Sequence, residues 1–272
     1  MKKIFTKTSI YYLLSFLIPL IIISIVLAFQ GIWWGSDTTI LASDGFHQYV
    51  IFNQTLRNAL HGDGSIFYTF TSGLGLNFYA LSSYYLGSFL SPIVFFFNIQ
   101  SMPDALYLVT IVKFGLIGLS TFVSLKGIHQ YLKEKWALLL STSLSLMSFS
   151  TSQLEINNWL DVFILLPIIL LGLHRLLTGK GQIIYYVALT CLFVQNYYFG
   201  YMTAIFLIIW TLVQLSRLKG QKLKRFVNFT LVSILSALSS LFMLLPTYLD
   251  LKTHGETFTN IVNLKTEDSW YL

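Results

Sequence analysis

Two charged residues lie inside apolar stretches of the sequence, where a charge is costly and indicates a specific role. Lys113 lies within the apolar run Ala105–Leu125, and Asp161 lies near the start of the run Trp159–Leu177. A charge at such a depth usually faces a cavity or a partner. Lys113 could hold a phosphate, pair with Asp161 or Asp104, or lay its stem along apolar surface with its ammonium in water. Asp161 could equally hydrogen-bond within its own helical hairpin.

A second pair of candidates is acidic and lies outside the apolar runs. Asp37 and Asp44 follow the first apolar run closely, and Asp44 begins a segment in which apolar residues recur at helical spacing. The plain interpretation of Asp44 is a carboxylate at a helix start, where a negative charge is favoured. A divalent cation held by Asp37 and Asp44 stays open, although no other feature of the sequence supports one.

The common catalytic and cofactor motifs are missing from the sequence. There is no H-E-x-x-H, no phosphate loop of the P-loop type and no G-x-S-x-G. His47 lies near Asp44 but has no other histidine at metal-ligand spacing, and the single cysteine, Cys191, lies in an apolar run. We therefore predict neither a metal site nor a bound cofactor.

The composition predicts a membrane protein whose first partner is the lipid bilayer. Of the 272 residues, 55% are hydrophobic and only 10% are charged, whereas a soluble domain is roughly 25% charged. Such a chain argues against a soluble enzyme and against a disordered protein. The net charge of +6 does not indicate nucleic-acid binding, because the basic residues cluster between apolar runs, as they do in membrane proteins.

The apolar runs predict an all-α polytopic fold with about seven transmembrane helices. The run Ile183–Leu215 is counted as two short helices that turn near Asn196, because a single helix of that length would be about 50 Å long. The expected spans are Ile10–Phe29, Ala105–Leu125, Trp136–Ser152, Trp159–Leu177, the two helices within Ile183–Leu215, and Phe226–Leu249, which is broken near Pro246.

The charge distribution predicts a cytoplasmic amino terminus. Thirteen of the 17 Lys and Arg residues then lie on the cytoplasmic side: Lys2, Lys3, Lys7, Lys126, Lys133, Lys135, Arg175, Lys180, Arg217, Lys219, Lys222, Lys224 and Arg225. Every acidic residue except Glu134 falls on or near the outer side. Acidic residues contribute little to orientation, so their asymmetry suggests that the outer face uses carboxylates.

Residues 30–104 are expected to form a large first outer loop that carries juxtamembrane helices. Asp44–Leu60 is predicted to be an amphipathic helix capped by Ser43, and Ser65–Leu76 a compact loop. Tyr85–Ile99 is apolar but short, which favours an interfacial or re-entrant segment. The loop is either a structured cap or a substrate platform on the outer leaflet.

Six motifs, in order along the chain, resemble the YfhO family of bacterial membrane proteins. They are Asp44-Gly-Phe-His-Gln-Tyr49, Ser65-Ile-Phe-Tyr-Thr-Phe-Thr-Ser-Gly-Leu-Gly75, Ile111-Val-Lys-Phe-Gly115, Asn158-Trp-Leu-Asp-Val-Phe-Ile-Leu-Leu-Pro167, Asn196-Tyr-Tyr-Phe-Gly-Tyr-Met202 and Leu244-Leu-Pro-Thr-Tyr248. Family members are usually longer, so the chain resembles the amino-terminal portion of such a protein. We expect residues 1–272 to form one transmembrane module, with residues 250–272 beginning a further, truncated outer loop.

The YfhO family resembles the GT-C glycosyltransferases, and this resemblance implies an activity. It implies an enzyme of the bacterial plasma membrane that moves a sugar from a polyprenyl-phosphate carrier to an extracellular cell-envelope acceptor such as lipoteichoic acid. Two alternatives stay open at this point. One is a transporter or flippase for a lipid-linked sugar, and the other is a non-catalytic membrane assembly factor.

The resemblance also implies roles for individual residues. GT-C enzymes keep the catalytic carboxylate in the first outer loop, soon after the first helix, and Asp44 matches that position, with Asp37 as its rival. Lys113 is the predicted cation for the carrier phosphate, and Arg57 is a weaker candidate. The remaining predicted substrate-binding residues are Asp161, Gln48, Asn196 and Tyr197.

Overall fold

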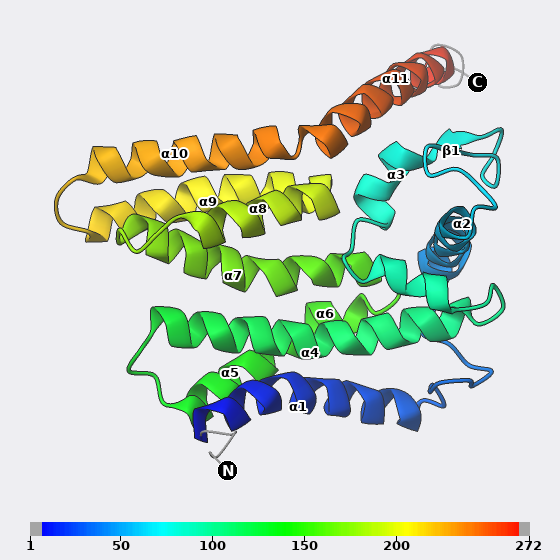
Figure 1. Ribbon diagram of the computed structural model, residues 1–272. Coiled ribbons are helices and arrows are strands. Elements are labelled where there is room, and N and C mark those ends of the chain that lie inside the picture. The colour runs from blue at the N-terminus through cyan, green and yellow to red at the C-terminus, as the bar shows by residue number, and fades with distance from the viewer. Residues whose placement is uncertain (1–6, 267–272) are drawn as a thin grey trace.

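The computed structural model describes the backbone of residues 7–266 and the side chains of residues 9–253. Most of it is helical, and the long helices lie side by side in one stack (Figure 1). The helices are α1 (Lys7–Phe29), α2 (Val50–Leu60), α3 (Phe78–Tyr85), α4 (Met102–Ile128), α5 (Glu134–Ser145), α6 (Ser148–Ser152), α7 (Leu160–Leu177), α8 (Ile183–Gln195), α9 (Tyr197–Arg217), α10 (Lys222–Ser239) and α11 (Leu241–Thr266). Shorter helical turns are η1 (Gly45–Tyr49, a π-helix), η2 (Ser91–Phe96) and η3 (Asn157–Trp159), the last two of the 3₁₀ type.

The predicted all-α fold holds apart from one small hairpin. Strands β1 (Tyr68–Thr69) and β2 (Leu76–Asn77) pair antiparallel within the segment expected to be a compact loop. Within the residues that the structure describes, four helices, α1, α4, α7 and α9, are long and apolar enough to cross a membrane, and α10 with α11 makes a fifth if that bent pair is one span. The polytopic membrane character is therefore confirmed. The number seven and the GT-C-like architecture stay predictions.

The predicted third span, Trp136–Ser152, is broken in the structure. Helix α5 ends at Ser145, and α6 begins only at Ser148. The segment is rich in serine and threonine, whose hydroxyl groups compete for backbone carbonyls and weaken a helix. Ser145 Oγ donates instead to the carbonyl of Phe114 on α4, at 2.6 Å. At about 1.5 Å per residue, α5 is about 18 Å long and cannot cross the bilayer by itself.

The last predicted span is also broken, but not at the expected residue. Helices α10 and α11 meet at an angle of 71°, with the break at Ser240, whereas Pro246 lies inside α11. Ser240 Oγ donates to the carbonyls of Ser236 at 2.8 Å and Thr190 at 3.3 Å. Sharp bends at such serine sites are common.

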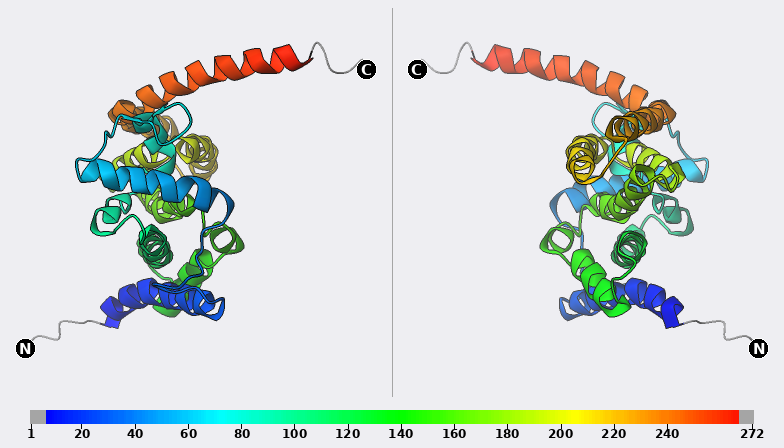
Figure 2. Two further views of the ribbon diagram at one scale, coloured as in Figure 1. Left: turned by 90° about the vertical axis from the view of Figure 1, so that its right-hand side faces the viewer. Right: turned by 90° about the vertical axis from the view of Figure 1, so that its left-hand side faces the viewer.

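Beyond the bend, α11 passes over α3 and leaves the bundle (Figures 1 and 2). It extends to Thr266. Residues 250–266 are therefore helical, although the sequence suggested that an outer loop begins there. Residues 267–272 of that predicted loop lie outside the described residues.

Helices α4 and α7 form the centre of the bundle and run in the same direction. Their apolar windows are 61% and 56% buried, compared with 22% and 28% for α1 and α9. Lys113 of α4 contacts Asp161 of α7, and further along both helices Gly127 of α4 faces Leu171 of α7. The two helices are therefore parallel. Parallel neighbours require the chain between them to return across the bundle. Helices α5 and α6 make this return, which supports a further crossing although neither helix is long enough alone.

Small residues allow the central helices to approach closely. A Cβ atom on Gly115 would lie 2.7 Å from Cε2 of Phe16, and one on Gly118 would collide with the carbonyl of Ser15. Helix α1 therefore packs on α4 at nearly backbone contact, as is common in membrane bundles, where small residues substitute for a hydrophobic driving force.

Residues 30–104, called the outer segment below after the predicted outer loop, gather at one end of the stack (Figure 1). The basic connections that follow α4, α7 and α9 lie at the other end. The predicted helix Asp44–Leu60 is present as η1 and α2, which bury Tyr49, Val50 and Phe52 against the outer segment and the start of α4. The predicted cap is wrong, because Ser43 has a φ of +42° and the helix start has no side-chain cap.

Candidate functional site

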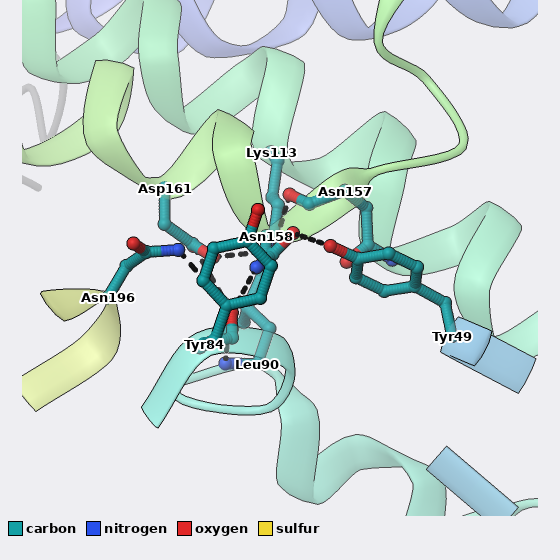
Figure 3. Close-up of polar contacts among 9 residues, drawn as sticks. Tyr49, Tyr84, Leu90, Lys113, Asn157, Asn158, Asp161 and Asn196 are labelled. Carbon is teal, nitrogen blue, oxygen red and sulfur yellow. Dashed lines mark hydrogen bonds and ion pairs between the residues drawn. The ribbon is translucent and has the colours of Figure 1, made fainter. Parts of the chain in front are cut away.

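Lys113 and Asp161 form an ion pair in the interior of the bundle (Figure 3). The Nζ and Oδ2 atoms are 2.7 Å apart, and both side chains are buried. Lys113 Nζ also donates to the carbonyl of Asn157 at 2.9 Å, and Asp161 Oδ1 accepts from Ser88 Oγ at 3.0 Å. Charges taken out of water require such partners. Among the sequence-based alternatives, the structure shows the pairing with Asp161; phosphate binding by Lys113 stays a prediction.

Asn158 joins the outer segment to the bundle beside this ion pair (Figure 3). Its amide donates to the carbonyl of Tyr84, and its oxygen accepts from the hydroxyl of Tyr49 at 2.6 Å. Asn196 donates to the same Tyr84 carbonyl at 3.4 Å. Burial, with the neighbouring Tyr84 and Tyr85, raises the pKa of Tyr49 well above its ordinary value. Tyr49 is therefore a neutral hydrogen-bond donor over the physiological pH range.

The outer segment reaches into the bundle at Gly87 and Ser88. A Cβ atom on Gly87 would collide with the carbonyl of Gln195, at the end of α8. The next residue, Ser88, is buried and supplies the hydroxyl that contacts Asp161. Irregular backbone is tolerated at such a place because protein surrounds it. The segment Tyr85–Ile99 thus contacts the centre of the bundle and does not only lie on its surface.

Asp44 is exposed where the chain turns into η1. Its Oδ1 atom accepts from Gln48 Nε2 at 3.2 Å. The adjacent Gly45 is buried against the loop before α7, since a Cβ atom there would lie 2.9 Å from Cβ of Glu155. Glu155 Oε2 is itself buried and has no hydrogen-bond partner among the described residues. Two carboxylates from separate loops therefore lie in adjoining segments.

Two other predicted residues, Asp37 and Arg57, lie away from the ion pair of Lys113 and Asp161. Asp37 is exposed on the loop after α1. Arg57 donates through Nε to the carbonyl of Phe97 at 2.6 Å and so fixes α2 to the end of η2. Asp104, which the sequence offered as a partner of Lys113, accepts instead from the backbone of Gly35 at 2.7 Å.

A cavity of about 510 Å³ opens between α3, the start of α9 and α11. Four tyrosines line it: Tyr84, Tyr85, Tyr197 and Tyr198. Tyr197 was a predicted substrate-binding residue, and the structure places it in the wall of this cavity. Asn196, predicted for the same role, is buried and caps α9 by accepting from an N–H of its first turn at 3.0 Å.

The candidate site residues predicted from the sequence did not include Glu155, Asn157 and Asn158, whose contacts were therefore missed. A signal was available, because three polar side chains lie three to six residues before a carboxylate that is inside an apolar run. Tyr49 and Ser88 gave no such signal. Their partners lie 109 and 73 residues away in the sequence, a separation that local patterns do not report.

The described residues offer no ready place for a metal ion. Between residues 9 and 253, no group of three or more His, Cys, Asp or Glu side chains is arranged to hold one.

Comparison with known proteins assigns the family. The chain matches the family described as "Bacterial membrane protein YfhO" over residues 15–272. The "Uncharacterized protein YfhO" of Bacillus subtilis (strain 168) is 25% identical over 205 residues, which cover 69% of this chain and 23% of that relative. No solved structure matches the chain. Because the family match takes in both the bundle and the outer segment, the chain belongs to the YfhO family of bacterial membrane proteins.

Proposed function

We propose that this chain forms part of a GT-C-type membrane glycosyltransferase. The enzyme would move a sugar from a polyprenyl-phosphate carrier to an extracellular cell-envelope acceptor such as lipoteichoic acid. The observation that carries the proposal is that Asp44 is exposed and belongs to residues 30–104, which gather at the end of the bundle opposite the basic loops. Burial first, and then the charges of Tyr84 and Asp44, raise the pKa of Tyr85. Tyr49, five residues after Asp44, contacts Tyr85 in the wall of the tyrosine-lined cavity, with ring centroids 5.3 Å apart.

The proposed chemistry requires a base and a leaving group. The acceptor hydroxyl oxygen bonds to the anomeric carbon of the donor sugar while the bond from that carbon to the phosphate oxygen breaks. Asp44 takes the hydroxyl proton, and the carrier phosphate leaves with the electron pair. Lys113 and Arg57 are the predicted cations for this phosphate. Both are engaged, by Asp161 and by the Phe97 carbonyl respectively, so binding of the phosphate would require them to exchange partners.

The proposed orientation places the amino terminus in the cytoplasm and the catalytic face outside the bacterial plasma membrane. The arrangement of the chain supports it, since the basic connections and the outer segment lie at opposite ends of the stack (Figure 1). Lys and Arg on short loops set orientation in this way.

A transporter or flippase for a lipid-linked sugar is the second candidate. The buried Lys113–Asp161 pair favours it, because ionisable groups inside a bundle often mark a transport path. A non-catalytic assembly factor remains the third. Sugar transfer by the purified protein distinguishes the first candidate from the other two.

The test of the proposed function is Asp44→Asn, which keeps the size of the side chain but cannot accept the proton. Glycosylation of the cell envelope, measured at matched expression, should fall by about 10²–10⁴-fold. Asp63→Asn is the matched control, because Asp63 lies in an exposed loop between Gly62 and Gly64. Near-normal activity of Asp44→Asn would exclude it as the base. A large loss in Asp37→Asn alone would assign the role to Asp37.

A further inference from the structure

We infer that the tyrosine-lined cavity between α3, α9 and α11 binds an uncharged saccharide unit. The assignment of that sugar to a lipid-linked donor or to an envelope acceptor rests on the proposed function. The inference that the cavity binds a sugar rests on the residues that line it. Its volume of about 510 Å³ falls in the range of roughly 300–1,000 Å³ that small-molecule sites occupy. The cavity opens at the outer end of the bundle, on the same side as Asp44.

The four tyrosines line the cavity, and their rings contact one another at several angles. The ring of Tyr84 is 4.8 Å from that of Tyr85, 5.9 Å from Tyr197 and 6.4 Å from Tyr198, between centroids. The corresponding interplanar angles are 76°, 49° and 70°. A pyranose has an apolar C–H face and a rim of hydroxyl groups. Tyrosine matches both, because it offers an apolar ring and a hydroxyl that can donate or accept.

The other polar groups of the wall favour a neutral ligand. Asp250 and Asn77 line the cavity, and among the described lining residues there is no Lys, Arg or His. A carboxylate accepts hydrogen bonds from sugar hydroxyls, whereas a phosphate is usually bound by basic side chains, which the described lining residues do not supply. The cavity therefore suits the sugar itself and not the phosphate of a lipid carrier.

The walls of the cavity are fixed before any ligand binds. Thr247 Oγ1 on α11 donates to Ser83 Oγ on α3 at 2.8 Å, and the hydroxyl of Tyr79 donates to the carbonyl of Phe242 at 3.1 Å. The 71° bend at the end of α10 directs α11 across α3, where these bonds form. A preformed wall lowers the ordering cost of binding.

The test measures binding of simple glycosides to the purified full chain in detergent. Methyl β-D-glucopyranoside, methyl α-D-galactopyranoside and methyl N-acetyl-β-D-glucosaminide serve as probes in saturation-transfer NMR, with inorganic phosphate as the anionic probe. At least one glycoside should bind, and phosphate should not compete with it. Tyr198→Ala should weaken that binding about tenfold or more, which corresponds to the loss of about 1.4 kcal/mol.

Tyr201→Ala is the matched control. Tyr201 lies three residues further along α9, is 67% exposed and does not line the cavity. Tyr198 is itself 46% exposed, so its removal should leave the fold intact. Tyr198→Phe keeps the ring and should retain more binding than Tyr198→Ala. Equal losses in Tyr198→Ala and Tyr201→Ala, no binding of any glycoside to the wild type, or displacement of the glycoside by phosphate would overturn the inference.

Two further measurements separate this inference from the proposed function. Asp44→Asn should lower transfer by about 10²–10⁴-fold but bind the glycoside as the wild type does. Glycosylation by the wild type without any glycoside binding would therefore overturn the inference alone. Tyr198→Ala in a transfer assay identifies the source of the sugar. A raised KM for a short-chain polyprenyl-phosphate glucose assigns the cavity to the donor sugar, and a raised KM for the acceptor assigns it to the acceptor; either result supports the site.

Discussion

At the scale of single residues, the ion pair of Lys113 and Asp161 predicts that single and double substitutions differ in their effect on folding stability. Lys113→Met or Asp161→Asn alone leaves the other group buried without its partner, which should cost about 3–5 kcal/mol of folding stability. The double variant Lys113→Met/Asp161→Leu leaves no buried charge and should recover most of the loss. Thermal unfolding of the four proteins in one detergent measures this. A double variant as unstable as the single variants would contradict the prediction.

The same double variant also tests whether the pair takes part in function. If it folds and still supports envelope glycosylation, the pair acts only in stability. If it folds and loses activity, at least one of the two charges is needed for the reaction or for binding of the carrier.

Tyr49 gives a prediction about pH. Burial raises its folded-state pKa above the usual value of about 10. The unfolded chain therefore loses this proton first as the pH rises, and stability present below pH 10 declines above it, by up to about 1.4 kcal/mol per pH unit. Tyr49→Phe should reduce this decline between pH 10 and 11, as measured by unfolding in detergent. Tyr201→Phe, at an exposed position, should not.

At neutral pH, Tyr49→Phe should have a separate effect. It removes the donor to Asn158 Oδ1, and leaving that buried acceptor without a partner should cost about 1–3 kcal/mol. Unchanged stability at pH 7 would show that another donor replaces the tyrosine.

At the scale of helices, close packing of α1 on α4 predicts that Gly118 tolerates no side chain. Gly118→Leu would force α1 away from α4, because even a Cβ atom collides with the Ser15 carbonyl. Overpacking of this kind costs about 1–3 kcal/mol or more, and the unfolding temperature and the yield of folded protein should both fall. Gly64→Ala is the control, since its Cβ atom would meet only ordinary contacts of 3.6 Å or more.

The accuracy of the predicted helix boundaries depended on the kind of residue at which each helix ends. The spans Ile10–Phe29, Ala105–Leu125 and Trp159–Leu177 agree with α1, α4 and α7, because long uncharged runs with flanking charges define them. The failures lie where serine and threonine break the helix, at Ser145–Ser148 and at Ser240. Hydrophobicity does not detect such breaks, since these hydroxyls contact carbonyls on neighbouring helices.

The residues of the candidate site were also predicted only in part. Lys113, Asp161 and Asp44 were identified because their charge conflicts with an apolar run or fits a family motif. That Lys113 and Asp161 meet each other, and that Ser88 and the carbonyl of Asn157 contact them, depends on contacts between distant segments. No local pattern contains that information.

At the scale of the whole molecule, the arrangement of the loops predicts which positions are accessible from outside. In a Cys191→Ser background, cysteine at Gly64 should react with an impermeant reagent applied to intact cells, and cysteine at Gln130 should not. Both positions are exposed at opposite ends of the bundle, so accessibility of the side chain does not bias the comparison. Labelling of position 130 in intact cells would reverse the proposed orientation.

The ion pair between α4 and α7 also sets an order in time during synthesis. Its members are 48 residues apart in the sequence, and ribosomes add about 5–20 residues per second. Lys113 is therefore made about 2–10 s before Asp161. A lysine at the centre of an inserting helix costs about 2.5–3.5 kcal/mol. Helix α4 must bear that cost at the translocon, or wait beside it, until α7 emerges and supplies the carboxylate.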